Sequence, residues 1–224
     1  MKRDQSGFTL IEIAIVLVII GLLLGGVLKG QELINSAKVK NLAADFKNVP
    51  VFVYGYQDKF KALPGDDASI GTASTHVTGA TACAPAAANK CATGNGVIDG
   101  SWNATAITDE SYIFWQQVRL AGLAPGSTNT SVADYIPSNA VGGKIGITNS
   151  GANNPITLPS PLKGSYIVCS GAIAGKFAKQ LDITMDDSNT ATGSMMVLDP
   201  ANASTAIATN LIADDTPYTV CMGF

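Results

Sequence analysis

The chain has little of what enzymes use for catalysis. It contains one histidine, His76, and only 14% of its 224 residues are charged. The G-x-S-x-G, H-E-x-x-H, Walker and dinucleotide-binding patterns are all missing. A lone histidine in a Thr- and Gly-rich loop is most simply a solvated loop residue. Because no catalytic constellation can be assembled from these residues, we expect that the protein is not an enzyme.

Basic residues are scarce as well, and the cysteines lack the spacing of a metal or redox motif. The formal net charge is −3, whereas a nucleic-acid-binding surface favours a basic stripe. No nucleic-acid partner is therefore predicted. The four cysteines form no C-x-x-C pair, which argues against a zinc site and against a thioredoxin-like function.

One long hydrophobic run near the start dominates the sequence. Residues 8–28 read FTLIEIAIVLVIIGLLLGGVL and contain a single charge, Glu12. As a helix this run would span about 31 Å, the thickness of a bilayer's hydrocarbon core. A secretory signal peptide has a shorter apolar core and a small-residue cleavage site, whereas this run passes directly into a polar segment. The run therefore predicts a membrane-spanning helix that is retained.

The charges that flank the run predict its orientation. Lys2 and Arg3 precede it and Lys29 follows it. The positive-inside rule then places Met1–Gly7 in the cytoplasm and the residues after the run outside the cytoplasmic membrane.

Glu12 has two interpretations. In the first, Thr9 and Glu12 form a capping box at the helix start, where a carboxylate also suits the positive end of the helix dipole. In the second, Glu12 lies on the same helix face as Phe8, four residues earlier. If the chain were cut after Gly7, the new amino group of Phe8 could pair with Glu12 of the same or an adjacent chain in a low dielectric.

The sequence Gly7-Phe8-Thr9-Leu10-Ile11-Glu12, after a short basic leader and before an apolar helix, resembles the processing site of type IV prepilins and pseudopilins. The resemblance implies that prepilin peptidase, a membrane aspartyl protease, cuts between Gly7 and Phe8 and N-methylates Phe8. It also implies that Glu12 neutralises the terminal amine of a neighbouring subunit during assembly.

The same resemblance implies partners and a location. The partners are further copies of the chain and other pilins in a filament, the prepilin peptidase, and an inner-membrane assembly platform. The protein would first cross the bacterial inner membrane once, with a cytoplasmic N-terminus. It would then join a periplasmic or extracellular filament at the cell surface.

The apolar run differs from many pilins in one respect, since it has no proline near its middle. Gly21, Gly25, Gly26 and Gly30 occupy that region instead. Glycine weakens a helix by roughly 1 kcal/mol relative to alanine, which allows local unwinding. Small residues also let helices approach closely, so packing between helices is the alternative.

After Lys29 the pattern becomes amphipathic. Apolar residues recur every three or four positions, as on one helix face: Leu42, Phe46, Val49, Val53, Tyr56 and Phe60. We predict one helix from about Phe8 to about Phe60, bent near Pro50 and ended by the Pro-Gly sequence that follows Leu63. This divides the chain into a leader (1–7), a membrane or fibre-core helix (8–28), an amphipathic half-helix (29–62) and a globular head (63–224).

The head, about 160 residues long, is large enough for one hydrophobic core. Residues 68–106 predict loops, and a second helix should run from an N-cap at Thr108 to Gly122, with Phe114, Trp115 and Val118 inward. Strands are predicted at 144–148, 166–169, 194–198 and 218–224, and a third helix at 173–183. The fold class is α+β, with the long helix packed on a mostly antiparallel sheet and two short helices.

Four cysteines outside the cytoplasm suggest two disulfides, for which three connectivities are possible. The short loop between Cys83 and Cys91 favours their pairing, which leaves Cys169 with Cys221. This second pair resembles the disulfide-bounded C-terminal region of many pilins. Free buried thiols are the alternative.

No metal site is assigned, although calcium is a hypothesis. Acidic pairs at Asp66–Asp67, Asp186–Asp187 and Asp214–Asp215 all lie beside turn-forming residues. Residues Gly94–Gly100 loosely resemble a calcium loop but lack its alternating acids.

Taken together, the sequence predicts a structural subunit of a type IV pilus-like filament. A type II secretion pseudopilin is an alternative within the same class. An alternative of a different class is a surface binding protein that stays anchored in the membrane through the same helix, with its leader uncut.

Overall fold

The computed structural model describes residues 10–83, 89–202 and 204–224. The predicted cleavage site, Gly7 and Phe8, and the capping residue Thr9 lie outside the described residues. The described chain forms two compact units, residues 10–38 and 39–224.

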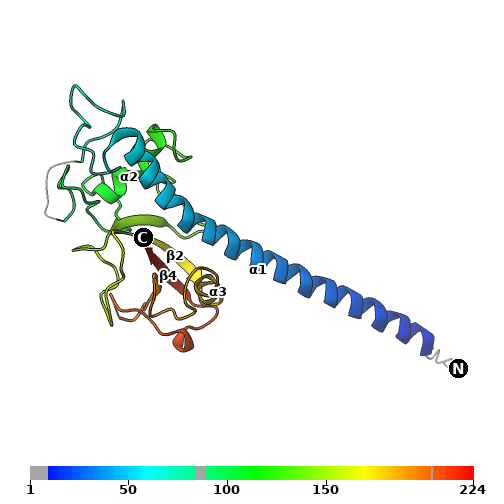
Figure 1. Cartoon of the computed structure of the whole chain (residues 1–224). Coiled ribbons are helices and arrows are strands. Elements are labelled where there is room, and N and C mark those ends of the chain that lie inside the picture. Colours follow the sequence, from blue (N-terminus) through cyan, green and yellow to red (C-terminus); the bar gives the residue numbers. More distant parts are fainter. Residues whose placement is uncertain (1–9, 84–88, 203) are drawn as a thin grey trace, which may run out of the picture. The chain divides into compact units, whose positions relative to one another are not determined.

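Helix α1, Leu10–Phe60, confirms the predicted long helix over the described residues (Figure 1). In the first unit it stays helical through Gly21, Gly25, Gly26 and Gly30, so the described chain is not unwound there. A Cβ added at any of these four glycines would meet nothing within 4 Å. Space for close approach by another helix is therefore present at all four.

In the second unit, α1 buries one face, as the apolar spacing predicts. Leu42, Val53 and Tyr56 are completely inaccessible to solvent, and Phe46 and Val49 are almost so. Phe60, the last residue of the stripe, is only half-buried. The helix includes Pro50, after which it continues for three further turns to Phe60.

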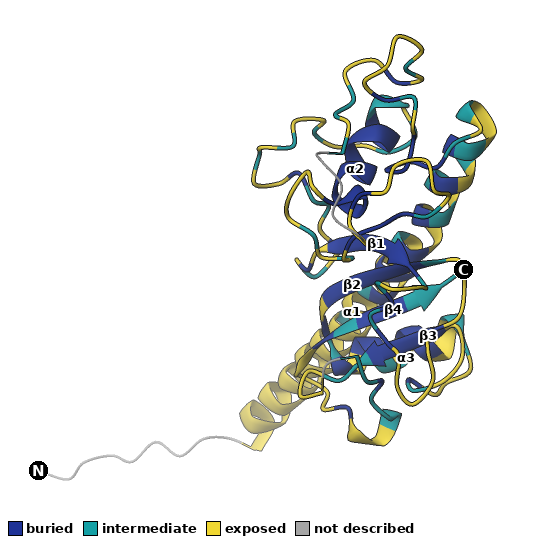
Figure 2. Ribbon diagram, turned by 90° about the vertical axis from the view of Figure 1, so that its left-hand side faces the viewer, coloured by how far each residue is buried: buried dark blue, intermediate teal, exposed yellow. Residues whose placement is uncertain are grey.

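Four strands form one antiparallel sheet in the order β1-β2-β4-β3 (Figures 1 and 2). Their bounds are Ile145–Asn149 for β1, Tyr166–Ala174 for β2, Met195–Leu198 for β3 and Pro217–Gly223 for β4. Helix α3, Gly175–Met185, connects β2 to β3, and a 3₁₀ turn, η1, covers Thr209–Leu211. The predicted α+β class is confirmed.

The sheet is covered on both faces, because apolar side chains of β2, β3 and β4 alternate between two cores, whereas β1 contributes only to the first. One core includes the buried stripe of α1 and strand residues Ile147, Val168 and Val220. The other core contains Ile167, Cys169, Met196 and Cys221 together with Ile156, Leu162 and Ala206 from the connecting segments. Burial of both faces explains the short, almost continuously apolar strand sequences.

Helix α2, Glu110–Leu120, begins two residues after the predicted N-cap. The N-cap is Asp109, not Thr108; the Thr108 hydroxyl instead donates a hydrogen bond to the Asp109 carboxylate. Phe114, Trp115 and Val118 are buried, as predicted. The chain leaves α2 through Gly122, whose φ of 77° lies in the left-handed region that glycine adopts easily.

Buried polar side chains hold the loops that surround α2 and β1. Arg119 donates from Nε to the carbonyl of Pro125 and from Nη1 to those of Ser127 and Tyr135. Asn139 donates to the Gly171 carbonyl and accepts from the amides of residues 141 and 143. These bonds let long loops pack closely, since buried backbone groups need partners.

Candidate functional site

The apolar segment of α1, residues 10–28, exposes its side chains on all sides. Every leucine, isoleucine and valine in it is exposed, from 88% of the residue at Leu10 to 46% at Ile20. α1 is long and apolar enough to cross a membrane, and no part of its most apolar window is buried. Soluble monomers rarely expose an apolar surface of this extent, which instead marks contact with lipid or with other proteins.

Glu12 lies in the first turn of α1 and is exposed. It is the only ionisable residue among residues 10–28. Apolar side chains alone do not fix how one such helix lies against another. A carboxylate close to the positive end of the helix dipole can fix it, by pairing with a positive charge on the partner. The roles predicted for Gly7, Phe8 and Glu12 remain predictions, because the first two lie outside the described residues.

Both cysteine pairs form disulfides in the head. Cys169 and Cys221 are directly opposite each other on β2 and β4, with their Cα atoms 4.1 Å apart, and both are completely buried. This disulfide joins neighbouring strands at the centre of the sheet. Cys83 and Cys91, eight positions apart in the sequence, close a short loop, part of which lies outside the described residues.

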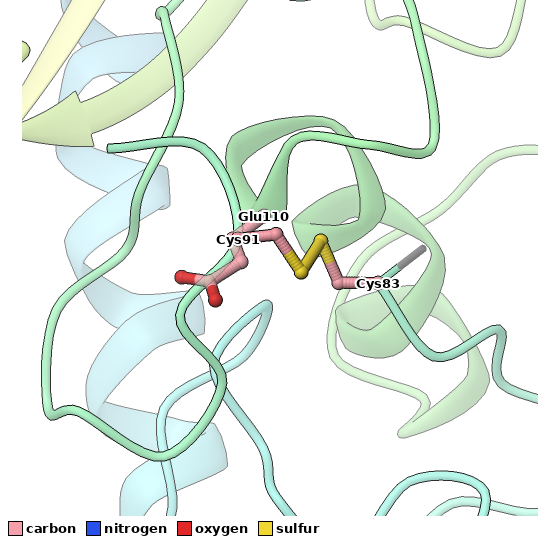
Figure 3. A group of neighbouring side chains, drawn as sticks. All are labelled: Cys83, Cys91 and Glu110. Carbon is pink, nitrogen blue, oxygen red and sulfur yellow. A yellow bond between two sulfur atoms is a disulfide. The ribbon is translucent and has the colours of Figure 1, made fainter. Parts of the chain in front are cut away.

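The Cys83–Cys91 disulfide lies next to Glu110, which makes this group a geometric candidate for metal binding (Figure 3). The cysteine sulfurs are bonded to each other and are not thiolate ligands. A Glu110 carboxylate oxygen lies within 4.8 Å of both sulfurs, and the carboxylate accepts hydrogen bonds from the amides of Ala92 and Asp99, both 2.9 Å long. Its role is to hold the 92–99 loop on α2.

Glu110 and Asp66 organise that loop from two sides. Asp66 accepts hydrogen bonds from the amides of Gly94, Asn95 and Gly96. Burial raises the pKa of Asp66. Burial and the charges of Asp66 and Asp99 raise the pKa of Glu110 to about 7, although the hydrogen bonds from the two amides act to lower it. The Asp66 carboxylate thus supports the loop that resembles a calcium site in sequence, and backbone amides occupy its oxygens.

The structure corrects one expectation about a polar loop residue and adds to another. Asp66 and Asp67, which lie beside turn-forming residues, are buried, with exposures of 4% and 2%. His76 is not simply solvated, because its Nδ1 lies 2.9 Å from Asp67 Oδ2 and its ring stacks on Phe60.

The Tyr56 hydroxyl donates to the same Asp67 oxygen that His76 contacts. Burial raises the pKa of Asp67, but hydrogen bonds from Ser69, His76 and Tyr56 outweigh this and lower it below its ordinary value. The group fastens the 66–76 loop to α1. The Ser69 hydroxyl accepts a hydrogen bond from the main-chain amide of His76, a contact that does not activate the hydroxyl as a nucleophile, so no acyl-transfer site follows from the group.

The second geometric candidate for metal binding is a group of three aspartates at the end of α3. Asp182, Asp186 and Asp187 each place one carboxylate oxygen within 4.8 Å of the others. The acidic pair at 186–187 was recognised from the sequence, but Asp182 was not. The signal that could have revealed it is its spacing of four residues before Asp186, which puts both on one helix face.

Comparison with known families gave one match. Residues 2–28 match the model of the prokaryotic N-terminal methylation motif, which is characteristic of the class III signals of type IV pilins and pseudopilins. The resemblance recognised in residues 7–12 is thereby confirmed. No curated protein sequence matches the chain. No solved structure matches it either.

The match covers the N-terminal signal and the whole apolar segment, and it points to a structural protein of the pilin type. Pilus and secretion pseudopilin share this motif, which does not separate them. The apolar helix and the class III signal together fit a protein that is first anchored in a membrane and then joins a surface filament.

Proposed function

We propose that this protein is a structural subunit of a type IV pilus-like filament. Prepilin peptidase cuts the leader between Gly7 and Phe8 and methylates the new amino group of Phe8. The mature chain then leaves the inner membrane at an assembly platform, and its apolar segment packs against the same segment of neighbouring subunits. The observation that carries the proposal is the methylation motif placed directly before a helix that exposes apolar side chains all round.

The physical reason for assembly is the exposed surface of residues 10–28. In the membrane, lipid tails cover these side chains. In a filament, sister helices would cover them, and the gaps at Gly21, Gly25, Gly26 and Gly30 would let the helices approach closely. Apolar contact has no preferred partner or register, whereas Glu12 opposite the amino group of a neighbouring Phe8 would define the register at which a subunit enters.

The decisive experiment is mass analysis of the N-terminus of the native protein. A chain that starts at methylated Phe8 supports filament export. A chain that retains Met1 supports the alternative of a permanently anchored surface protein. The Gly7→Ala variant should keep its leader, and a correctly cut product from this variant would contradict processing by prepilin peptidase.

Imaging of sheared surface filaments, with identification of their subunit, distinguishes a pilus from a secretion pseudopilin. Recovery of the chain in long surface filaments under native expression supports the pilus. A processed chain that occurs only in the cell envelope supports the pseudopilin.

A further inference from the structure

The side chain of Asp182 is buried and has no hydrogen-bond partner in the part of the chain that the structure describes. It lies on α3 among the buried residues Phe177, Ala178 and Leu181, and its exposure is 1%. Neither carboxylate oxygen of Asp182 has a hydrogen-bond partner among the described residues. A buried carboxylate in this state is costly, because the water that would solvate it has been removed and nothing replaces that water.

The nearest ionisable neighbours increase this cost. Asp186 and Asp187 are both acids, and together with burial they raise the pKa of Asp182 to about 7. The lysines of α3 do not relieve the charge, since Lys176 and Lys179 pair with Asp215 and Asp214. The ion pairs between described residues leave all three aspartates without a basic partner.

The position of the cluster on α3 is also unusual for acids. The three aspartates lie in and just beyond the last turn, where the helix dipole is negative, and that turn contains no basic residue. Three carboxylates gathered at the negative end of a helix dipole together favour a cation.

Two of the three carboxylates are held in place by the segment that leads into β3. Asp186 accepts hydrogen bonds from the Ser194 hydroxyl and, at 2.7 Å, from the Met195 amide. A Cβ at Gly193 would lie 2.0 Å from an Asp186 oxygen, so glycine is needed there. Asp187 accepts from the Asn189 amide and the Thr192 hydroxyl. Asp186 is half-buried and Asp187 exposed, which opens the cluster to solvent.

We propose that Asp182, Asp186 and Asp187 bind a calcium ion between the C-terminal end of α3 and the start of β3. Calcium takes six to eight oxygen ligands from carboxylates, carbonyls and water, and the cluster offers oxygen only. Zinc prefers nitrogen and sulfur ligands, and no histidine or cysteine belongs to the cluster. The ion would neutralise the buried Asp182 and tie α3 to β3. This inference does not depend on the proposed filament function.

The test is a calcium titration of the full chain, purified in detergent and stripped with chelator. Extracellular calcium sites bind with Kd values of about 10⁻⁴–10⁻³ M, so half-saturation is expected in that range. Calcium at ten times Kd raises the folded-to-unfolded ratio about elevenfold. For a domain of this size, that change raises the Tm by about 3–6 °C. Luminescence of bound terbium, displaced by calcium, provides a second readout that does not depend on unfolding.

Asp182→Asn should abolish both responses, while its Tm in chelator should equal or exceed that of the wild type because the buried charge is gone. Asp199→Asn is the matched control, since it removes a half-buried turn carboxylate elsewhere in the head and should leave both responses intact. If Asp182→Asn does not fold, the exposed Asp187→Asn takes its place and should weaken calcium binding at least tenfold.

The proposal is overturned if calcium changes neither Tm nor terbium luminescence of the wild type. It is equally overturned if the Asp182 or Asp187 variant responds as the wild type does. An equal effect of magnesium at the same concentration would contradict the assignment to calcium.

Discussion

The two parts of α1 have the same secondary structure but opposite surfaces. Residues 10–28 are apolar on every side and exposed, whereas the stripe from Leu42 to Tyr56 is apolar on one side and buried in the head. A one-sided stripe can be covered by a single sheet of the same chain. A helix that is apolar all round needs lipid or other chains on every side. The comparison shows that one segment is built for association and the other for folding.

The largest effect expected from this difference is on assembly. Glu12→Ala should permit removal of the leader but reduce the surface filament by roughly tenfold or more, because an amino group would enter the fibre core without its carboxylate. Immunoblotting of sheared filaments and mass analysis of the cell-bound protein measure the two steps. Glu32→Ala, which removes an exposed acid paired with Lys29, is the matched control and should assemble normally.

The Tm of the head should be the same in Glu12→Ala as in the wild type, because the substituted residue lies in the other unit. Normal filament output from Glu12→Ala would remove the proposed role of this residue.

The next effect concerns folding and should appear only in the second part of α1. Phe46→Ala should lower the free energy of unfolding of the head by about 3–5 kcal/mol, since it leaves a cavity in the main core. Val51→Ala, five residues further along the same helix, removes a side chain that is 64% exposed and should change that energy by less than about 0.5 kcal/mol. Denaturant unfolding of the full chain in detergent measures both, and equal losses would contradict the one-sided stripe.

The two disulfides should contribute unequally to the stability of the head. Cys169 and Cys221 are separated by 52 residues, and Cys83 and Cys91 by eight. Loop-closure entropy then predicts a loss of about 4 kcal/mol when the first pair is replaced by alanines and about 2.5 kcal/mol for the second. Unfolding of the two double variants measures the difference, and the reverse order would show that chain entropy is not the main cause.

The smallest effect expected is a pH dependence of the head. Because the pKa of Glu110 is raised from 4.5 to about 7, the folded state binds this proton more tightly than the unfolded state does. The resulting stability is fully present below pH 4.5 and is lost as the pH rises through 7. Between pH 5 and pH 8 the loss should be roughly 1–3 kcal/mol.

In chelator, Glu110→Gln should remove the contribution of Glu110 to the pH dependence of the unfolding free energy and so flatten the profile. Asp182→Asn should flatten it further, because the pKa of Asp182 is also raised in the folded state. An unchanged slope in Glu110→Gln would show that Glu110 keeps its ordinary pKa when the protein folds.

Sequence reasoning worked best where a periodic pattern governs the structure. The helix from residue 10 to residue 60, its buried stripe and the inward face of α2 all follow from spacing alone. The four strands were located to within a few residues at their starts, but β2 extends to Ala174, well beyond the predicted Cys169. β2 is longer because β4 pairs with it past a bulge after Ser170, and that pairing is a tertiary event.

The polar loops were the part that spacing could not resolve. In the sequence Asp66 and Asp67 lie beside turn-forming residues and Glu110 follows the predicted N-cap, yet all three are buried. Their partners are backbone amides or side chains up to 30 residues away, and no local pattern encodes such distances. His76 became a partner of Asp67 for the same reason.

The sequence by itself determined that the chain carries a class III signal, a helix apolar on every side and an amphipathic continuation of that helix. These features depend on local order and on the 3.6-residue helical period, which any single chain displays. Only the tertiary structure decided which carboxylates lose their water and which groups replace it. Burial depends on segments that are far apart in the sequence. From its sequence position Asp182 looks like an ordinary helix residue, but in the folded head it is buried beside two other acids.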